Sequence, residues 1–132
     1  MVVDTSILIA ILSGEPEMPV YSRTLQMESN LLMSAASLVE ATAVLLGRGG
    51  EGAVADLNSF VEAARIEIVT VSVAQARIAQ SAYLHYRKGR HRAGLNFGDC
   101  FVYALARDTG EPVFCKGNDF NQTDIECVTI SR

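Results

Sequence analysis

Short apolar runs alternate along this chain with longer segments in which apolar positions recur at helical spacing. The short runs are rich in aliphatic and β-branched residues, which is typical of buried strands. We expect strands at 1–3, 31–33, 66–71, 113–115 and 126–130. Between them the pattern predicts helices at 7–12, 19–28, 35–48, 53–65, 74–86 and 97–108. Pro19 suits the first turn of the second helix, and Gly49-Gly50 closes the third.

The alternation of strands with helices predicts an α/β fold, in which a mainly parallel five-stranded sheet is covered by helices on both faces. Crossovers between parallel strands are right-handed, so the expected topology is a doubly wound sandwich. Ligands bind such sheets beyond the carboxyl ends of the strands, where the strand order reverses. The polar residues at those strand ends are therefore the candidates for function.

The composition is that of a single folded domain covering residues 1–132, because 49% of the residues are hydrophobic and no linker or repeat is present. The longest uncharged stretch, 29–39, is too short to span a bilayer, and Asp4 stands where a signal peptide needs positive charge. We therefore expect a soluble cytoplasmic protein. The three cysteines lack C-x-x-C spacing, so reduced thiols are expected rather than a disulfide framework or a zinc site.

The net charge of −4 conceals an uneven distribution. No carboxylate occurs between Ile68 and Gly98, whereas both histidines and five cations fall in that segment. The cations are Arg77, Arg87, Lys88, Arg90 and Arg92. Cations are also favoured at a solvated helix C-terminus. Five of them without a carboxylate favour binding to a nucleic-acid backbone, with Tyr83 and Tyr86 as candidates for stacking on bases.

Four carboxylates occupy positions where chemistry is expected, although each also has a structural explanation. Asp4 ends the first strand and is a good helix N-cap. Asp99 follows Asn96 by three residues, which is the spacing of a capping box. Glu40 has apolar helical neighbours, so it is expected to point at protein and to need an arginine or a cation as its partner. Asp119 follows the fourth predicted strand and is also typical of an Asx turn.

If the first and fourth strands are neighbours, Asp4, Asp99 and Asp119 converge on one cleft, and Glu40 can face the same opening. Two carboxylates about 4 Å apart repel by roughly 4 kcal/mol at an effective dielectric constant near 20, and a divalent cation offsets this repulsion. Oxygen ligands without Cys or His select Mg²⁺ or Mn²⁺ over zinc. Such a site suits phosphodiester hydrolysis by metal-activated water. The supporting candidates are Thr5, Ser6 and Asn96.

Four stretches of the sequence, taken together, resemble the VapC toxins, a family of PIN-domain ribonucleases. They are Val3-Asp4-Thr5-Ser6, Glu40 within an Ala-rich helix, Leu95-Asn96-Phe97-Gly98-Asp99-Cys100 and Phe114-Cys115-Lys116-Gly117-Asn118-Asp119-Phe120. The similarity covers essentially the whole chain, in order. It implies a PIN-like three-layer α/β/α sandwich. It also implies a Mg²⁺-dependent endoribonuclease, the toxin of a type II toxin–antitoxin pair, whose substrates are structured RNAs such as tRNA or rRNA.

Position by position, the resemblance assigns metal-binding and catalytic roles to Asp4, Glu40, Asp99 and Asp119. Asn118 stands where several relatives have another acid, so the fourth acid rests on Asp119 alone. The resemblance further implies a homodimer and a small VapB-like antitoxin. Inhibition is then expected to use a cationic side chain of the antitoxin that enters the acidic cleft.

Three other functions compete with this hypothesis. A metal-independent ribonuclease would use His85 and His91, but residues six apart at a helix end are not expected to face each other. A phospho-receiver domain needs an acidic pair after the first strand and an aspartate after the third, where this chain has Asp4 alone and Thr70-Val71-Ser72. A non-catalytic PIN-like module that binds RNA or protein stays open, and RNA cleavage by the purified protein distinguishes it.

Overall fold

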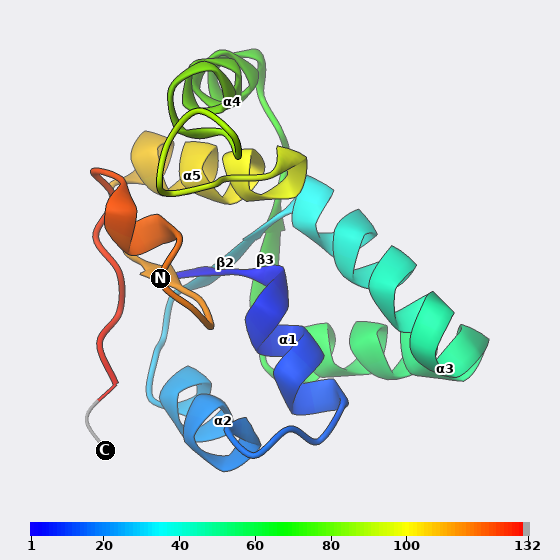
Figure 1. Ribbon diagram of the computed structural model, residues 1–132. Coiled ribbons are helices and arrows are strands. Elements are labelled where there is room, and N and C mark those ends of the chain that lie inside the picture. The colour runs from blue at the N-terminus through cyan, green and yellow to red at the C-terminus, as the bar shows by residue number, and fades with distance from the viewer. Residues whose placement is uncertain (131–132) are drawn as a thin grey trace.

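In the computed structural model, which describes residues 1–130, strands and helices lie close to the positions expected from the sequence pattern (Figure 1). The strands are β1 (Val2–Val3), β2 (Leu31–Ser34), β3 (Ile66–Val69) and β4 (Val113–Phe114). The helices are α1 (Thr5–Leu12), α2 (Met18–Gln26), α3 (Ala35–Ala63), α4 (Val73–Tyr86) and α5 (Phe97–Thr109), with a short 3₁₀ helix, η1 (Phe120–Gln122), near the C-terminus.

The four strands form one parallel sheet in the order β3-β2-β1-β4. β1 is internal, because Val2 pairs with Leu32 of β2 on one side and with Val113 of β4 on the other. The chain runs from β1 outward through β2 and β3 and returns to the opposite side of β1 with β4, so the strand order reverses between β1 and β4. The two strands expected to flank the candidate cleft are therefore neighbours.

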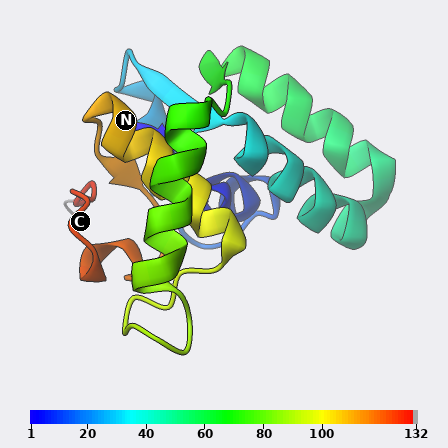
Figure 2. The ribbon, with the colours of Figure 1, turned by 90° about the horizontal axis from the view of Figure 1, so that it is seen from above.

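Successive residues of each strand face two separate cores, which gives the fold its three layers (Figures 1 and 2). Val3 and Phe114 enter the core shared with α1, α2 and α3, whereas Val2 and Val113 enter the core on the side of α5. α4 packs across α5 and forms the outer part of that layer (Figure 2). The predicted α/β/α sandwich is confirmed.

One predicted strand differs from the observed structure, and one pair of predicted helices shares a single label. The fifth strand expected at 126–130 is wrong, because Cys127 forms only an isolated bridge to Val113 and the sheet has four strands. A β-branched pattern favours extended backbone, but a strand needs a partner that matches it along its length. The two helices predicted at 35–48 and 53–65 are confirmed as the two halves of α3, which is broken by a kink at Gly50, where φ is 67° and ψ is −162° (Figure 1). A positive φ of this kind favours glycine.

The three cysteines lie at different depths in the fold. Cys100 is buried, Cys115 and Cys127 are half-buried, and all three are free thiols. Within residues 1–130, no helix combines the length and the apolar character that crossing a membrane requires.

Candidate active site

Asp4 lies between β1 and α1, at the carboxyl edge of the sheet. It caps α1, with Oδ2 accepting a hydrogen bond from Ser6 N at 3.1 Å, and it is only 6% exposed. Burial raises the pKa of this carboxyl group, hydrogen bonds from Ser6 offset part of the rise, and the charge of Glu40 adds to it. The expected N-cap is confirmed, and the cap is at the same time a buried carboxylate at the point where strand order reverses.

Ser6 joins Asp4 to the loop that follows β4. Its hydroxyl group donates to Asp4 Oδ2 at 2.5 Å and accepts a hydrogen bond from Lys116 N at 2.9 Å. Thr5 Oγ1 instead donates to Ser37 O at 3.3 Å and is directed toward α3. Of the two hydroxyl groups singled out in the sequence, only that of Ser6 therefore contacts a candidate acid.

Asp99 occupies the first turn of α5 and forms a complete capping box with Asn96. Asp99 N donates to Asn96 Oδ1 at 2.9 Å, and Asn96 N donates to Asp99 Oδ2 at 3.0 Å. The pKa of Asp99 is raised to about 6, chiefly by burial and then by the charges of Asp4, Glu40 and Asp119. The expected capping box is confirmed, and the same carboxyl group is affected by the charges of the three other acids.

Glu40 reaches from the second turn of α3 to the N-terminus of α5. A Cβ atom at position 98 would overlap its carboxylate, so the side chain lies directly against the backbone of Gly98, next to Asp99. None of the ion pairs formed within residues 1–130 involves Glu40. The arginine partner that would have explained this carboxylate structurally is therefore not observed in the described chain.

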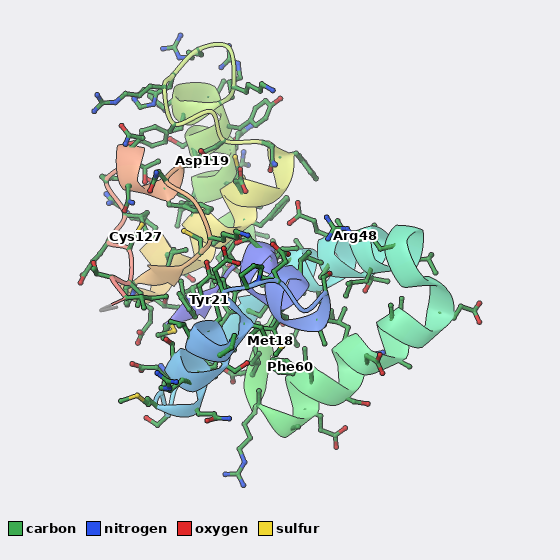
Figure 3. The ribbon with its side chains drawn as sticks, turned by 60° about the horizontal axis from the view of Figure 1, so that its bottom comes forward. Met18, Tyr21, Arg48, Phe60, Asp119 and Cys127 are labelled. Atoms are coloured by element: carbon green, nitrogen blue, oxygen red, sulfur yellow. The ribbon has the colours of Figure 1, made fainter. Side chains whose placement is uncertain are left out.

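Asp119 lies on the exposed loop between β4 and η1 (Figure 3). It precedes η1 as the N-cap residue, but its side chain forms no capping hydrogen bond, so the expected Asx turn is not found there. Its charge raises the pKa of Asp99 and of the Cys115 thiol, which places it on the same side of the sheet as the other acids. Among the four carboxylates, Asp119 is the one exposed to solvent.

Four separate elements thus bring Asp4, Glu40, Asp99 and Asp119 into one electrostatic neighbourhood. Within residues 1–130, no three Asp, Glu, His or Cys side chains are already arranged to hold a metal ion. The donor set nevertheless fits a hard divalent cation, because it consists of carboxylate oxygens, and burial and neighbouring charges disfavour the ionised forms of Asp4 and Asp99. A cation placed among them relieves both effects.

The basic segment divides into two parts. Lys88, Arg90 and Arg92 are exposed on the loop after α4, and this loop is closed by hydrogen bonds from Lys88 N to Leu95 O and from Leu95 N to Tyr86 O. Arg87 begins the loop, with Nη1 donating to Leu84 O at 2.8 Å. Arg77 lies ten residues earlier in α4, which is about 15 Å along the helix axis. The loop leads directly into α5, which carries Asp99, and Arg77 is set apart from the loop along α4.

The two histidines lie on different parts of the chain at the end of α4. α4 ends at Tyr86, so His91 lies on the returning loop, and both rings line one hollow of about 570 Å³ with Tyr86 and Arg90. His91 packs edge-on against Tyr86, with ring centroids 4.9 Å apart. Only His85 lies on the helix, and the expectation that the two side chains do not face each other stays a prediction.

Two residues with a direct bearing on this site were not singled out from the sequence. Gly98 admits the Glu40 carboxylate, and a glycine in the first turn of a helix, next to a candidate acid, is the signal that points to it. Phe97 is 74% exposed beside the same turn. From the sequence alone, an apolar residue in such a motif is expected to be buried. No sequence signal therefore identifies the exposure of Phe97.

Comparison with known proteins gives consistent matches over almost the whole chain. Residues 1–126 match the family model of the PIN domain. The chain is 44% identical over 130 residues to the VapC ribonuclease Mb0640 of Mycobacterium bovis, covering 98% of this chain and 99% of that protein. It is 43% identical over 128 residues to the ribonuclease VapC of Mycolicibacterium smegmatis, covering 97% and 99%.

Solved structures support the fold. The chain resembles VapC20 of Mycobacterium tuberculosis, a toxin that cleaves the sarcin-ricin loop, with a TM-score of 0.78 and 19% identity over 96% of this chain and 97% of that one. It also resembles VapBC2 of Rickettsia felis, bound to a DNA fragment from its promoter, with a TM-score of 0.75 and 15% identity over 98% of each chain. At these identities the likeness concerns the fold alone.

Proposed function

The chain belongs to the PIN-domain family and, within it, to the VapC ribonucleases, and on this premise we propose that it is a toxin endoribonuclease that hydrolyses structured RNA with a bound divalent metal ion. One observation carries the proposal. The Glu40 carboxylate lies against the backbone of Gly98, next to Asp99, and the charges of Asp4, Glu40 and Asp119, from three other parts of the chain, all raise the pKa of Asp99. Acids used only as helix caps gain nothing from this proximity.

Asp4 and Asp99 are the residues best placed to hold the ion, because helix caps and backbone hydrogen bonds fix both side chains. Glu40 and Asp119 complete the set of metal ligands in this proposal. The long side chain of Glu40 and the exposed loop position of Asp119 allow both carboxylates to turn toward the ion. Mg²⁺, with Mn²⁺ as a substitute, supplies a lowered pKa for bound water and neutralises charge on the phosphate. Glu40 Oε2, which has no ion-pair partner in residues 1–130, is the group we assign to accept the proton of the attacking water.

The loop carrying Lys88, Arg90 and Arg92 supplies the binding surface for RNA. Its cations take part in none of the ion pairs formed by the described residues, so they remain available to phosphates. We propose tRNA or rRNA as the substrate class. The partner that we propose is a VapB-like antitoxin, since several structures with this fold are VapBC complexes, among them VapBC-1 of Haemophilus influenzae. A homodimer in the cytoplasm completes the proposal.

The experiment that tests this function incubates the purified protein with total RNA in Mg²⁺, Mn²⁺ or EDTA and sequences the RNA ends. We expect discrete cleavage with 5′-phosphate and 3′-hydroxyl ends, no cleavage in EDTA, and no cleavage by Asp99→Asn. Cleavage in EDTA, or products that carry 2′,3′-cyclic phosphate, would transfer the chemistry to His85 and His91. If the wild-type protein is as inert as Asp99→Asn with every metal, the non-catalytic binding module becomes the better explanation.

A further inference from the structure

Phe97 is an aromatic residue left in solvent beside the acids. It is the first residue of α5, two positions before Asp99, and is 74% exposed. Its backbone neighbour Gly98 contacts the Glu40 carboxylate. The ring therefore stands at the edge of the candidate active site, on a helix end whose backbone is fixed by the capping box.

The fold makes little use of this ring. Its aromatic contact is an edge-on one with Phe101, at a centroid distance of 5.1 Å and an interplanar angle of 78°. Phenylalanine is among the residues most often buried in folded proteins, and an exposed phenyl group gives up the stabilisation that burial provides. A leucine at this position would keep an apolar contact with Phe101. The aromatic face is therefore not explained by packing within the chain.

The surroundings of Phe97 combine apolar surface with positive charge. A cleft of about 520 Å³ between α4 and α5 is lined by Phe97, Phe101, Tyr83 and Leu84, and Tyr83 and Leu84 are themselves 44% and 56% exposed. The basic loop returns to α5 directly before Phe97, since Leu95 is hydrogen-bonded to Tyr86 and Lys88 (Figure 2). An aromatic face next to unpaired cations is the combination that binds unstacked nucleic-acid bases and their phosphates.

We infer that Phe97 is a substrate-binding residue, which stacks on an unpaired RNA base next to the scissile phosphate while the loop of Lys88, Arg90 and Arg92 holds the backbone. This inference rests on the proposed function and deepens it, because it makes the substrate class an RNA with an unpaired base at the cleavage site. Stacking then helps to fix the register of the phosphodiester over the acids, in addition to increasing affinity.

A second copy of this chain could also cover an exposed apolar cleft, but the charges favour RNA. The cleft itself is lined by uncharged residues, but α4 and the loop after it carry five cations and no carboxylate from Ile68 to Gly98, so a symmetric contact through α4 and this loop would bring like charges together. A polyanion is attracted to the same surface. The oligomeric state of each variant distinguishes the two occupants.

The test measures binding of a short single-stranded RNA that contains one 2-aminopurine, whose fluorescence is quenched by stacking, with EDTA present to prevent cleavage. We expect Phe97→Leu and Phe97→Ala to abolish the quenching and to bind about 5- to 150-fold more weakly, which is the range for loss of one stacked base. Phe97→Trp should keep both the quenching and the affinity for RNA. Met27→Ala, at an exposed apolar residue after α2 and outside this cleft, is the control and should bind like the wild type.

Light scattering on every variant completes the experiment, and circular dichroism confirms that each is folded. If Phe97→Leu binds and quenches the probe as the wild type does, the stacking role of Phe97 is wrong, and the proposed ribonuclease function is unaffected. Dissociation of a dimer by Phe97→Ala, with RNA affinity reduced only in the dissociated form, assigns the cleft to a second copy instead. A wild-type protein that cleaves RNA but does not quench the probe refutes stacking alone, whereas one that neither binds nor cleaves RNA refutes the proposed function as well.

Discussion

The carboxylate of Glu40 occupies the space that a Cβ atom would take at position 98. An ideal Cβ there would lie only 2.6 Å from Glu40 Cδ, so the close approach exists because the residue is glycine. It joins the second turn of α3 to the first turn of α5 and brings Glu40 next to Asp99. A side chain from one layer of the sandwich thereby enters a site built at the edge of the sheet.

Gly98→Ala should reduce RNA cleavage without unfolding the protein. The added methyl group displaces the end of a flexible side chain rather than backbone, while alanine favours the helix by up to about 1 kcal/mol over glycine. We expect activity to fall by about 10- to 100-fold, the range seen when residues that position metal ligands are removed. Cleavage rates and thermal melting of the purified variant measure the two effects.

Gly47→Ala is the matched control for this substitution. Gly47 also lies in a helix, but a Cβ there meets no atom within 4 Å. We expect a small gain in melting temperature and full activity. Wild-type activity in Gly98→Ala would show that the position of Glu40 against the backbone is unimportant for the reaction.

Stabilisation by divalent cations should weaken as the pH falls through about 6. The pKa of Asp99 is raised to about 6, so the folded carboxyl group binds its proton more tightly than the unfolded one. In the metal-free protein, the ionised Asp99 carboxylate therefore lowers the stability of the fold above about pH 6. This loss of stability is relieved as the pH falls from about 6 toward 4. Mg²⁺ competes with that proton, so the rise in melting temperature with Mg²⁺ should be larger at about pH 7.5 than at about pH 5. Equal shifts at both pH values would contradict this.

Asp4→Asn should raise the melting temperature of the metal-free protein at neutral pH. It should also lower activity at least about 100-fold, which is the scale for removal of one group that stabilises charge in the transition state. The substitution removes a buried charge whose pKa is raised, while the amide oxygen can still accept the hydrogen bond from Ser6 N. Asp4→Ala also abolishes activity but removes the cap, so it should be about 1 kcal/mol less stable than Asp4→Asn. A melting temperature of Asp4→Asn below that of the wild type would mean that the charge serves the cap alone.

The double variant Arg90→Gln/Arg92→Gln should bind RNA more weakly and with less dependence on salt. Removing one cation that neutralises a phosphate of a single strand reduces the slope of log affinity against log salt by about 0.7, so the slope should fall by about 1.4. Arg77→Gln should have a smaller effect, because Arg77 lies away from the loop. Arg48→Gln is the control, since Arg48 lies on α3, well apart from Asp119 in Figure 3. A similar effect of all three would indicate non-specific electrostatics.

The sequence by itself determined the local structure and the chemical character of this protein. Apolar periodicity fixed the helices, and the capping chemistry of Asp4 and of Asn96 with Asp99 is local, since each involves residues at most three apart. The same patterns overestimated one element, at 126–130, because extended backbone requires a partner strand that a local pattern cannot specify.

Only the tertiary structure decided which of these residues act together. The pairing of β1 with β4 brings Asp4 and Asp119 to one edge, and it depends on how two apolar cores form on opposite faces of the sheet. The approach of Glu40 to Gly98 and the exposure of Phe97 are likewise set by packing between elements distant in sequence. Side-chain type and spacing are properties of a chain segment, whereas proximity and burial arise from the balance of the whole fold. The candidate acids were therefore identified from the sequence, but their convergence could be predicted only on the condition that β1 and β4 are neighbours.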